Sequence, residues 1–302
     1  MSNPDPDARL ISGSEVSTWQ TCQMKWWFQF RLGVQPIRLS DGLWRGSVGH
    51  EMLSEYYKSL ANGNSVEHSA DLMRRSIVRE IEKHNELLKT GYVNAIFHSE
   101  RMVLISELST LLEAYVRKYG TEDYVKYDVV EVEHMHVSGR FFAMRLDLLL
   151  RETDSGQLVL FDHKFVRDFY MEKQLKINSQ LPRYMKVVIG DREEEIKAGV
   201  LNQLRTRVVQ GENEFERATI PYNRKVADKR ARDQETVADD IRRHYRLTKA
   251  ESLEDVIRTF SDYTCKFCPF TGPCFKHLEG NDFAFKSDLN MNFERSTYGY
   301  NK

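Results

Sequence analysis

The sequence predicts an α/β protein in which a mixed central sheet is flanked by helices, with an α-helical front layer and a C-terminal segment that carries cysteines. Apolar residues recur at helical spacing between residues 15 and 119. From residue 127 onward, runs rich in β-branched and aromatic residues take over, and two of them alternate in polarity. Hydrophobic residues make up 41% of the 302 residues, enough for a sizeable core, so intrinsic disorder is excluded.

The front layer is predicted to consist of four helices. Ser14 is the expected N-cap of the first, over residues 15–30. The other three are expected where apolar residues recur every three or four positions, over residues 44–60, 70–87 and 102–119.

Three consecutive antiparallel strands are expected next, in the runs VVEVEHMHV, FFAMRLDLLL and QLVLFDHKF. Gly139 and the segment Asp154, Ser155, Gly156 supply turn signals between them. A helix around residues 168–188, strands over 196–208 and 217–220, and a long charged helix over 224–248 complete the prediction.

With only 16 Gly and 7 Pro and no repeat, the chain offers few places for a domain boundary. We therefore expect one domain over residues 1–280. Its parts are a front layer (1–126), a sheet core (127–222) and a segment with a helix and cysteines (223–280), and a polar tail follows (281–302).

Charge and hydropathy narrow the possible locations and partners. The 44 Lys and Arg balance 45 Asp and Glu, so any nucleic-acid surface must be local. No stretch approaches the roughly 20 apolar residues that cross a bilayer. The N-terminal residues lack the basic and apolar regions of a signal peptide. We expect a cytoplasmic protein, with no membrane partner.

Two acidic residues and a lysine occupy the second and third predicted strands. Asp162 and Lys164 are two residues apart, so their side chains should face the same side of the sheet. If the two strands pair through the intervening turn, Asp147 lies beside them. One lysine cannot neutralise two carboxylates in apolar surroundings, whereas Mg²⁺ or Mn²⁺ can. The alternative is a plain ion pair between Asp162 and Lys164, with Asp147 solvated.

Two further motifs stand in order around these residues. The segment GSVGH, residues 46–50, begins an amphipathic helix upstream, and Gln180 and Tyr184 lie four residues apart on a helix downstream. The order G-x-x-x-H, D, D-x-K and Q-x-x-x-Y resembles the RecB-type exonuclease branch of the PD-(D/E)XK nuclease superfamily, over about residues 12–280. The resemblance implies a restriction-endonuclease-like core.

The resemblance also implies roles for single residues. His50, Asp147 and Asp162 would bind Mg²⁺ or Mn²⁺, together with the backbone carbonyl of His163. Lys164 would position or activate the attacking water and offset charge at the phosphate. In addition, Gln180 and Tyr184 would hold the DNA backbone or the end being cut.

The chain's four cysteines point to a second metal site. Cys265, Cys268 and Cys274 form a C-x2-C-x5-C pattern, and Cys22 is the remaining one. Three clustered cysteines plus a distant one resemble CRISPR-associated exonucleases and AddB-type nuclease domains of the same branch, which implies a [4Fe-4S] cluster. A local Zn²⁺ site is the alternative, with His277 as fourth ligand and Cys22 free. Thiols without any metal are the third possibility.

The predicted activity is therefore that of a metal-dependent DNA exonuclease acting at linear or single-stranded ends in recombination, repair or DNA processing, in a bacterium or a phage-infected cell. No G-x-x-x-x-G-K-[ST] motif is present, so a separate helicase or recombination protein would supply any motor activity. A structure-specific endonuclease with the same site and a non-catalytic DNA-binding or assembly subunit are the alternatives.

Overall fold

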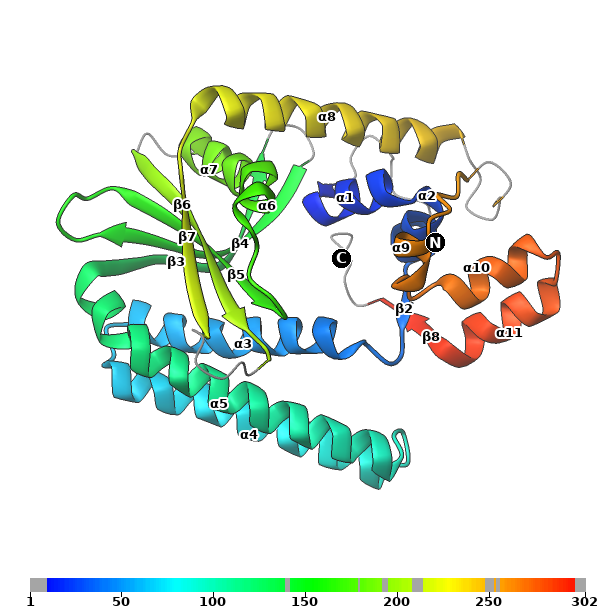
Figure 1. Cartoon of the computed structure of the whole chain (residues 1–302), viewed down its shortest axis with the longest axis horizontal. Coiled ribbons are helices and arrows are strands. Elements are labelled where there is room, and N and C mark those ends of the chain that lie inside the picture. Colours follow the sequence, from blue (N-terminus) through cyan, green and yellow to red (C-terminus); the bar gives the residue numbers. More distant parts are fainter. Residues whose placement is uncertain are drawn as a thin grey trace. The chain divides into compact units, whose positions relative to one another are not determined.

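The structure is a computed structural model that describes residues 10–138, 142–178, 180–191, 195–207, 214–247, 253 and 256–296. The chain divides into two compact units that alternate along the sequence (Figure 1). The cysteine unit comprises Met1–Leu39, Val137–Met144 and Lys229–Lys302. The sheet unit comprises Ser40–His136 and Arg145–Asp228.

The sheet unit is built around a mixed sheet in which β4, β5, β6 and β7 are neighbours in that order and β3 also pairs with β4. β4 and β5 are antiparallel, β5 and β6 parallel, and β6 and β7 antiparallel. These pairings confirm the predicted mixed sheet. The strands are β3 (Tyr127–Ser138), β4 (Phe142–Glu152), β5 (Leu158–Val166), β6 (Ile196–Arg205) and β7 (Phe215–Pro221).

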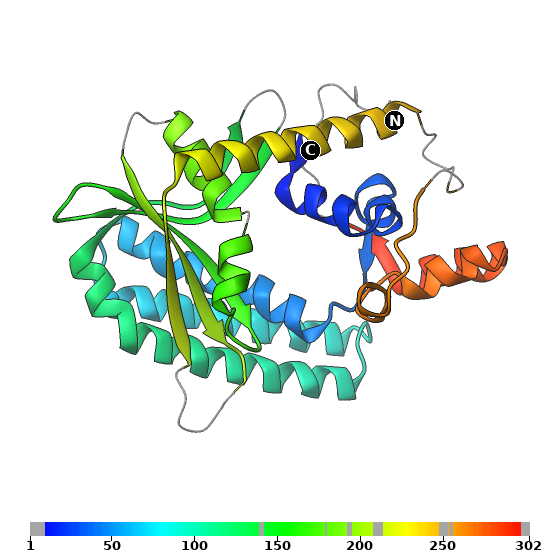
Figure 2. The ribbon, with the colours of Figure 1, turned by 45° about the horizontal axis from the view of Figure 1, so that its top comes forward.

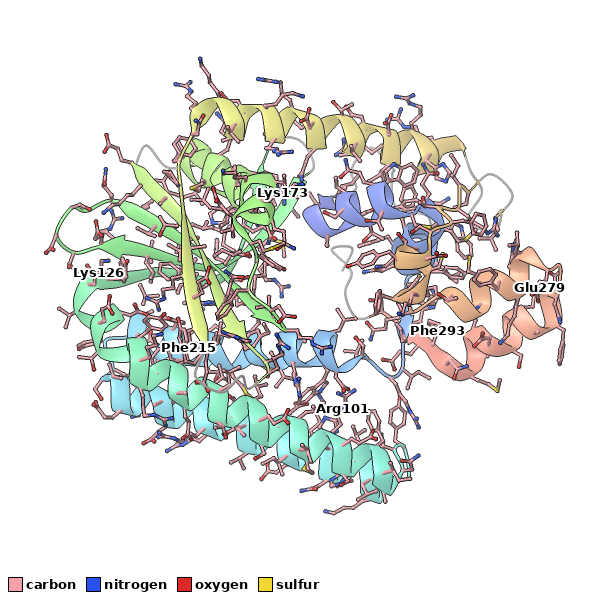
Figure 3. All side chains as sticks on the ribbon, in the orientation of Figure 1. Arg101, Lys126, Lys173, Phe215, Glu279 and Phe293 are labelled. Atoms are coloured by element: carbon pink, nitrogen blue, oxygen red, sulfur yellow. The ribbon has the colours of Figure 1, made fainter. Side chains whose placement is uncertain are left out.

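Helices cover both faces of this sheet (Figure 2). Asp162 of β5 contacts α7, whereas the next residue, His163, contacts α3. Because successive strand residues point to opposite faces, α3 and α7 lie on opposite sides. Phe215 of β7 packs against Tyr115 of α5, on the same side as α3 (Figure 3). The helices are α3 (Asp41–Ala61), α4 (Val66–Lys89), α5 (Ala95–Lys126), α6 (Glu172–Ile177) and α7 (Gln180–Asp191).

Side-chain caps explain where several of these helices begin. The side chains of Ser65 and Asn94 accept hydrogen bonds from backbone N–H groups in the first turns of α4 and α5. Asn178 does the same for the first two residues of α7. The predicted turn between β4 and β5 is present, with Gly156 at φ 71°. Gly139 and residues 208 and 248, at other predicted boundaries, lie outside the described residues.

The cysteine unit begins with β1 (Ile11–Ser12), which pairs in parallel with residues 142–143 of β4. The first predicted helix differs from the observed structure in two ways. Ser12 rather than Ser14 caps it, because the Ser12 hydroxyl accepts the N–H of Glu15. The helix also breaks at Cys22, whose backbone is extended. The resulting elements are α1 (Gly13–Thr21), α2 (Gln23–Trp26), a π-helix over Trp27–Arg31 and β2 (Val34–Pro36).

The remaining elements come from the C-terminal part of the chain. Residues 282–295, expected to be part of a polar tail, form a helix and a short strand that pairs with β2. Phe293 of this strand stacks on Phe270, which gives the segment an apolar contact (Figure 3). The elements are α8 (Arg224–Leu247), which begins in the sheet unit, α9 (Asp262–Lys266), α10 (Thr271–Leu278), α11 (Asp282–Asn292) and β8 (Phe293–Arg295). None of the helices in the described ranges is both long and apolar enough to span a bilayer.

Candidate active site and cysteine site

The register of β4 and β5 brings the two predicted aspartates together. Leu148 pairs with Phe161, so Asp147 lies one position further along, beside Asp162. The carboxylate of Asp147 accepts the backbone N–H of His163, at 2.7 Å from Oδ2. Asp147 is thereby held against the strand that carries Asp162 and Lys164.

A histidine and a further glutamate complete one side of this site. His50 of α3 places Nδ1 3.5 Å from Asp147 Oδ2 and 3.6 Å from Glu133 Oε1. Ligand atoms of His50, Glu133 and Asp147 all lie within 4.8 Å of one another, close enough to share one cation. Glu133 was not among the site residues predicted from the sequence. It lies on β3 at φ 49°, a left-handed backbone conformation that glutamate seldom adopts.

The approach of α3 to the sheet depends on Gly49, the residue before His50. A Cβ atom at this position would lie only 2.2 Å from the ring of Phe165 on β5. The His50 ring is centred 5.7 Å from the same phenylalanine ring. By contrast, a Cβ atom at Gly46 would meet nothing within 4 Å. Gly49 is therefore the glycine of the GSVGH segment that lets His50 reach the sheet.

Lys164 and Gln180 surround the buried carboxylate of Asp162. Lys164 Nζ lies 2.8 and 2.9 Å from the two oxygens of Asp162, which is 1% exposed. Gln180 Oε1 accepts from Lys164 at 3.3 Å, and Gln180 Nε2 donates to Asp162 Oδ1 at 3.0 Å. Gln180 Nε2 also donates to the hydroxyl of Tyr184 at 3.1 Å. Both polar atoms of the Gln180 amide are thus used within the site.

The electrostatics of the site favour a bound cation. Burial, and then the neighbouring Asp162, raise the pKa of Asp147 to about 7. Burial would lower the pKa of Lys164, but Asp162 and Asp147 raise it above its usual value. Burial likewise opposes the charge on His50, yet Glu133 and Asp147 raise its pKa. Glu133 also lies 4.0 Å from Arg145. His50, Glu133 and Asp147 together offer oxygen and imidazole ligand atoms, and a divalent cation fits this donor set.

A first prediction concerns the metal-free protein. Asp147 holds its proton up to about pH 7 in the fold and only to about pH 4 when unfolded, so ionisation of this residue lowers stability as the pH rises through that window. Asp147→Asn is expected to be more stable than the parent at pH 8, by on the order of 2 kcal/mol, and about equally stable at pH 4. Thermal unfolding in a chelator at both pH values measures this.

Asp154→Asn is the matched control, because Asp154 is exposed in the turn between β4 and β5. It should leave stability unchanged at both pH values. Equal stability of Asp147→Asn and the parent at pH 8 would show that Asp147 does not hold a proton unusually strongly.

A buried polar network lies on the face of β5 that α3 covers, next to His50, whose ring is centred 6.2 Å from that of His163. The His163 ring stacks on Tyr57, and its Nδ1 lies 2.8 Å from Asn202 Nδ2. Asn202 Nδ2 also donates to the hydroxyl of Tyr115 at 2.9 Å. Burial, aided by nearby His50, keeps the pKa of His163 well below its usual value, so the ring is neutral. These contacts fix the backbone of His163, whose N–H holds Asp147.

The charged pair of Arg217 and Asp123 anchors this network. Arg217 on β7 donates to both carboxylate oxygens of Asp123 on α5, at 2.6 and 2.7 Å. It also donates to Tyr115 and to Asn202 Oδ1, at 3.0 and 3.3 Å. The sequence analysis predicted no role for Arg217 or Asp123. Arg217 is a single arginine in the run FERATIP, which matches no motif.

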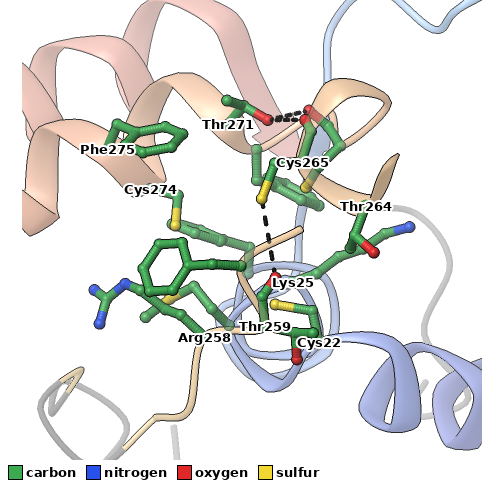
Figure 4. A pocket seen from close by; sticks show the side chains of 14 residues that line it. Cys22, Lys25, Arg258, Thr259, Thr264, Cys265, Thr271, Cys274 and Phe275 are labelled. Atoms are coloured by element: carbon green, nitrogen blue, oxygen red, sulfur yellow. Dashed lines mark hydrogen bonds between the residues drawn. The ribbon is translucent and has the colours of Figure 1, made fainter. Parts of the chain in front are cut away.

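The four cysteines meet in the cysteine unit. Cys22, at the break between α1 and α2, lines one pocket with Cys265, Cys268 and Cys274 (Figure 4). Burial, and then the neighbouring thiols, raise the pKa of Cys268, while Lys25 opposes the rise. The walls are apolar on one side, where Phe28 stacks on Phe270 with ring centres 5.0 Å apart.

The alternative zinc site fits this geometry less well. His277 does not line the cysteine pocket, and its Nδ1 lies 2.8 Å from a nitrogen of Arg258. Three sulfurs and one imidazole nitrogen around one Zn²⁺ ion, at about 2.0–2.3 Å, would lie within about 4 Å of one another. Among the residues that the structure describes, no three ligand atoms from the cysteines and His277 lie within 4.8 Å of one another. The described cysteines and His277 are therefore not arranged at the spacing of a single-ion site.

Comparison with known proteins gives a family match that spans most of the chain. The family model of the PD-(D/E)XK nuclease superfamily matches residues 10–275. Among solved structures, the chain is similar to a candidate exonuclease from Eubacterium rectale, at 13% identity over 88% of each chain with a TM-score of 0.45. It is also similar to SSO0001, at 16% identity over 65% of this chain and 78% of that chain, with a TM-score of 0.30. A search of curated proteins finds no match. Since the family match covers most of the chain and includes Asp147, Asp162 and Lys164, the chain belongs to the PD-(D/E)XK nuclease superfamily.

Proposed function

We propose that this nuclease is a metal-dependent DNA exonuclease that hydrolyses phosphodiester bonds at DNA ends and belongs to the RecB-type branch. The observation that supports the proposal is that Asp147, which contacts His50, accepts the backbone N–H of the residue that stands between Asp162 and its ion-pair partner Lys164. The order of these motifs, with Gln180 and Tyr184 following, supports the exonuclease branch. Roles in recombination, repair or DNA processing, beside a separate helicase or recombination protein, follow from that branch.

Some of the side chains would bind the cation, and others would contact the phosphate. His50, Asp147 and Asp162 would hold Mg²⁺ or Mn²⁺, with the His163 carbonyl and Glu133 as further ligands. The bound cation would generate a hydroxide near neutral pH and stabilise charge on the phosphate. Lys164 keeps its proton because its pKa is raised, so it offsets phosphate charge and orients water. Gln180 holds Lys164 and Asp162 in place.

Digestion of linear and covalently closed circular DNA with Mn²⁺ tests the proposal and its alternatives. An exonuclease degrades the linear form only. Degradation of both forms would favour the structure-specific endonuclease with the same site. Degradation of neither would favour a non-catalytic DNA-binding or assembly subunit.

For the cysteine site, we propose a [4Fe-4S] cluster held by Cys22, Cys265, Cys268 and Cys274. All four cysteines line one pocket, and among the described residues no three of their sulfurs lie as close together as the ligands of a single ion would. Such a cluster would join the end of α1 to the segment around α9 and α10, which are more than 240 residues apart along the chain. Its role would then be mainly structural.

Cys22→Ser is expected to lower iron content and thermal stability together, since it removes one cluster ligand and the link to α1. Iron analysis, visible absorbance and thermal unfolding measure both effects. His277→Ala is the matched variant, and it should keep its iron. Unchanged iron in Cys22→Ser would show that the distant ligand is wrong, and a colourless protein with one equivalent of zinc would favour the zinc site.

A further inference from the structure

A second group of metal-ligating side chains lies on β3, apart from the active site and the cysteine pocket. Ligand atoms of Glu131, His134 and His136 all lie within 4.8 Å of one another. Glu131 Oε2 lies 2.6 Å from His136 Nε2, and the imidazole rings of His134 and His136 are centred 5.0 Å apart. No motif of the nuclease family accounts for this group.

The backbone at Glu133 explains why these three side chains share one side of the strand. In a regular strand, Glu131 would face the side opposite to His134 and His136, because side chains alternate. Glu133, at φ 49°, interrupts the alternation, as an inserted residue in a β-bulge does. The side chain of Glu131 therefore joins those of His134 and His136, while Glu133 itself contacts His50.

A backbone conformation of this kind costs free energy and persists where the surroundings require it. The left-handed conformation of Glu133 has two consequences here. It directs Glu133 into the active site, and it gathers a carboxylate and two imidazoles a few residues away. The second group is thus linked to the first through one strained residue.

The chemistry of the second group differs from that of the active site. Two imidazoles and one carboxylate favour Zn²⁺ and similar first-row transition ions over Mg²⁺. His136 is 7% exposed and Glu131 is half-buried, so two ligands are held by their surroundings. His134 is exposed, which leaves a route for the ion and an open coordination position for water.

We propose that Glu131, His134 and His136 form a Zn²⁺ site. In the site, the bond between Glu131 and His136 gives way to two bonds to the ion, and His134 supplies the third. Zinc then ties together the residues on both sides of Glu133. Loading of this site would therefore fix the conformation of Glu133. The proposal goes beyond the nuclease function and does not depend on it.

The decisive variant is His134→Ala. His134 takes no part in the hydrogen bond between Glu131 and His136, so that bond can survive the substitution. If Glu131 and His136 only form a structural hydrogen bond, His134→Ala should leave zinc binding unchanged. If it is a zinc site, the variant loses one of three ligands.

Equilibrium dialysis of the full chain against Zn²⁺, followed by metal analysis, tests the proposal. His134→Ala and Glu131→Gln are expected to bind about one equivalent of zinc less than the parent, or to bind it at least about 10-fold more weakly. His68→Ala, which removes an exposed histidine of α4, should bind as much zinc as the parent. Asp147→Asn, which alters the active site, should still bind the equivalent that His134→Ala loses.

Two results would overturn the proposal. The first is equal zinc binding by His134→Ala and the parent. The second is that Asp147→Asn also fails to bind the zinc ion that His134→Ala fails to bind. That result would place this zinc ion in the active site. Neither result bears on whether the protein cleaves DNA, so this proposal and the nuclease function fail independently.

Discussion

Replacing Lys164 with methionine is expected to reduce DNA cleavage by about 10³-fold or more while leaving the fold intact. Methionine keeps most of the aliphatic chain and removes the ammonium group that lies 2.8 Å from Asp162. It thereby removes the positive charge that would offset the phosphate in the transition state. Digestion of end-labelled linear DNA with Mn²⁺ measures the loss, and circular dichroism checks the fold.

Lys186→Met is the matched control for this prediction. Lys186 lies on α7 and pairs with Asp228 at 2.8 Å, away from the acidic site. Its loss should leave cleavage within about twofold, since exposed ion pairs contribute little. Asp162→Asn should be as inactive as Lys164→Met. Cleavage at the parent rate by either site variant would remove these residues from the catalytic site.

Arg217→Met is expected to destabilise the protein by about 3–5 kcal/mol. The substitution leaves the buried carboxylate of Asp123, which is 4% exposed, without its cationic partner. It also removes the donor to Asn202 Oδ1. Denaturant unfolding measures the change. Arg79→Met, which breaks an exposed pair with Glu55, should change stability by less than about 1 kcal/mol.

A double variant separates a buried unpaired charge from a simple loss of packing. Arg217→Met combined with Asp123→Leu removes both charges, so it should recover part of the stability lost in Arg217→Met alone. If the double variant is less stable than the single one, the unpaired carboxylate is not the cause of the loss.

The fold class could be predicted from the sequence because its signals are local. The runs of β-branched and aromatic residues in β4 and β5, with the turn signals between them, predicted an antiparallel pair, and the structure confirms it. The segment after residue 281 folds through Phe293 and Phe270, which meet only in the tertiary structure. From its composition alone, this segment was therefore predicted to be a polar tail. The break of the first helix at Cys22 was likewise hidden in a run with ordinary helical spacing.

In the candidate site, too, some residues could be predicted from local sequence and others could not. Asp162 and Lys164 face one side of a strand, which follows from their spacing, and the structure places them in contact. Glu133 could not be found in this way, because its position depends on a positive φ that no sequence pattern announces. Arg217 is decisive only through its partner Asp123, 94 residues away along the chain. Residues that act through such distant partners need coordinates to be recognised.

Binding of Mn²⁺, followed by electron paramagnetic resonance, tests the central assignment most directly. The parent protein is expected to bind Mn²⁺ at the site of His50, Asp147 and Asp162, and Asp147→Asn is expected to lose that binding. His134→Ala should keep it. Equal Mn²⁺ binding by Asp147→Asn and the parent would contradict the assignment of these residues to one metal-dependent nuclease site.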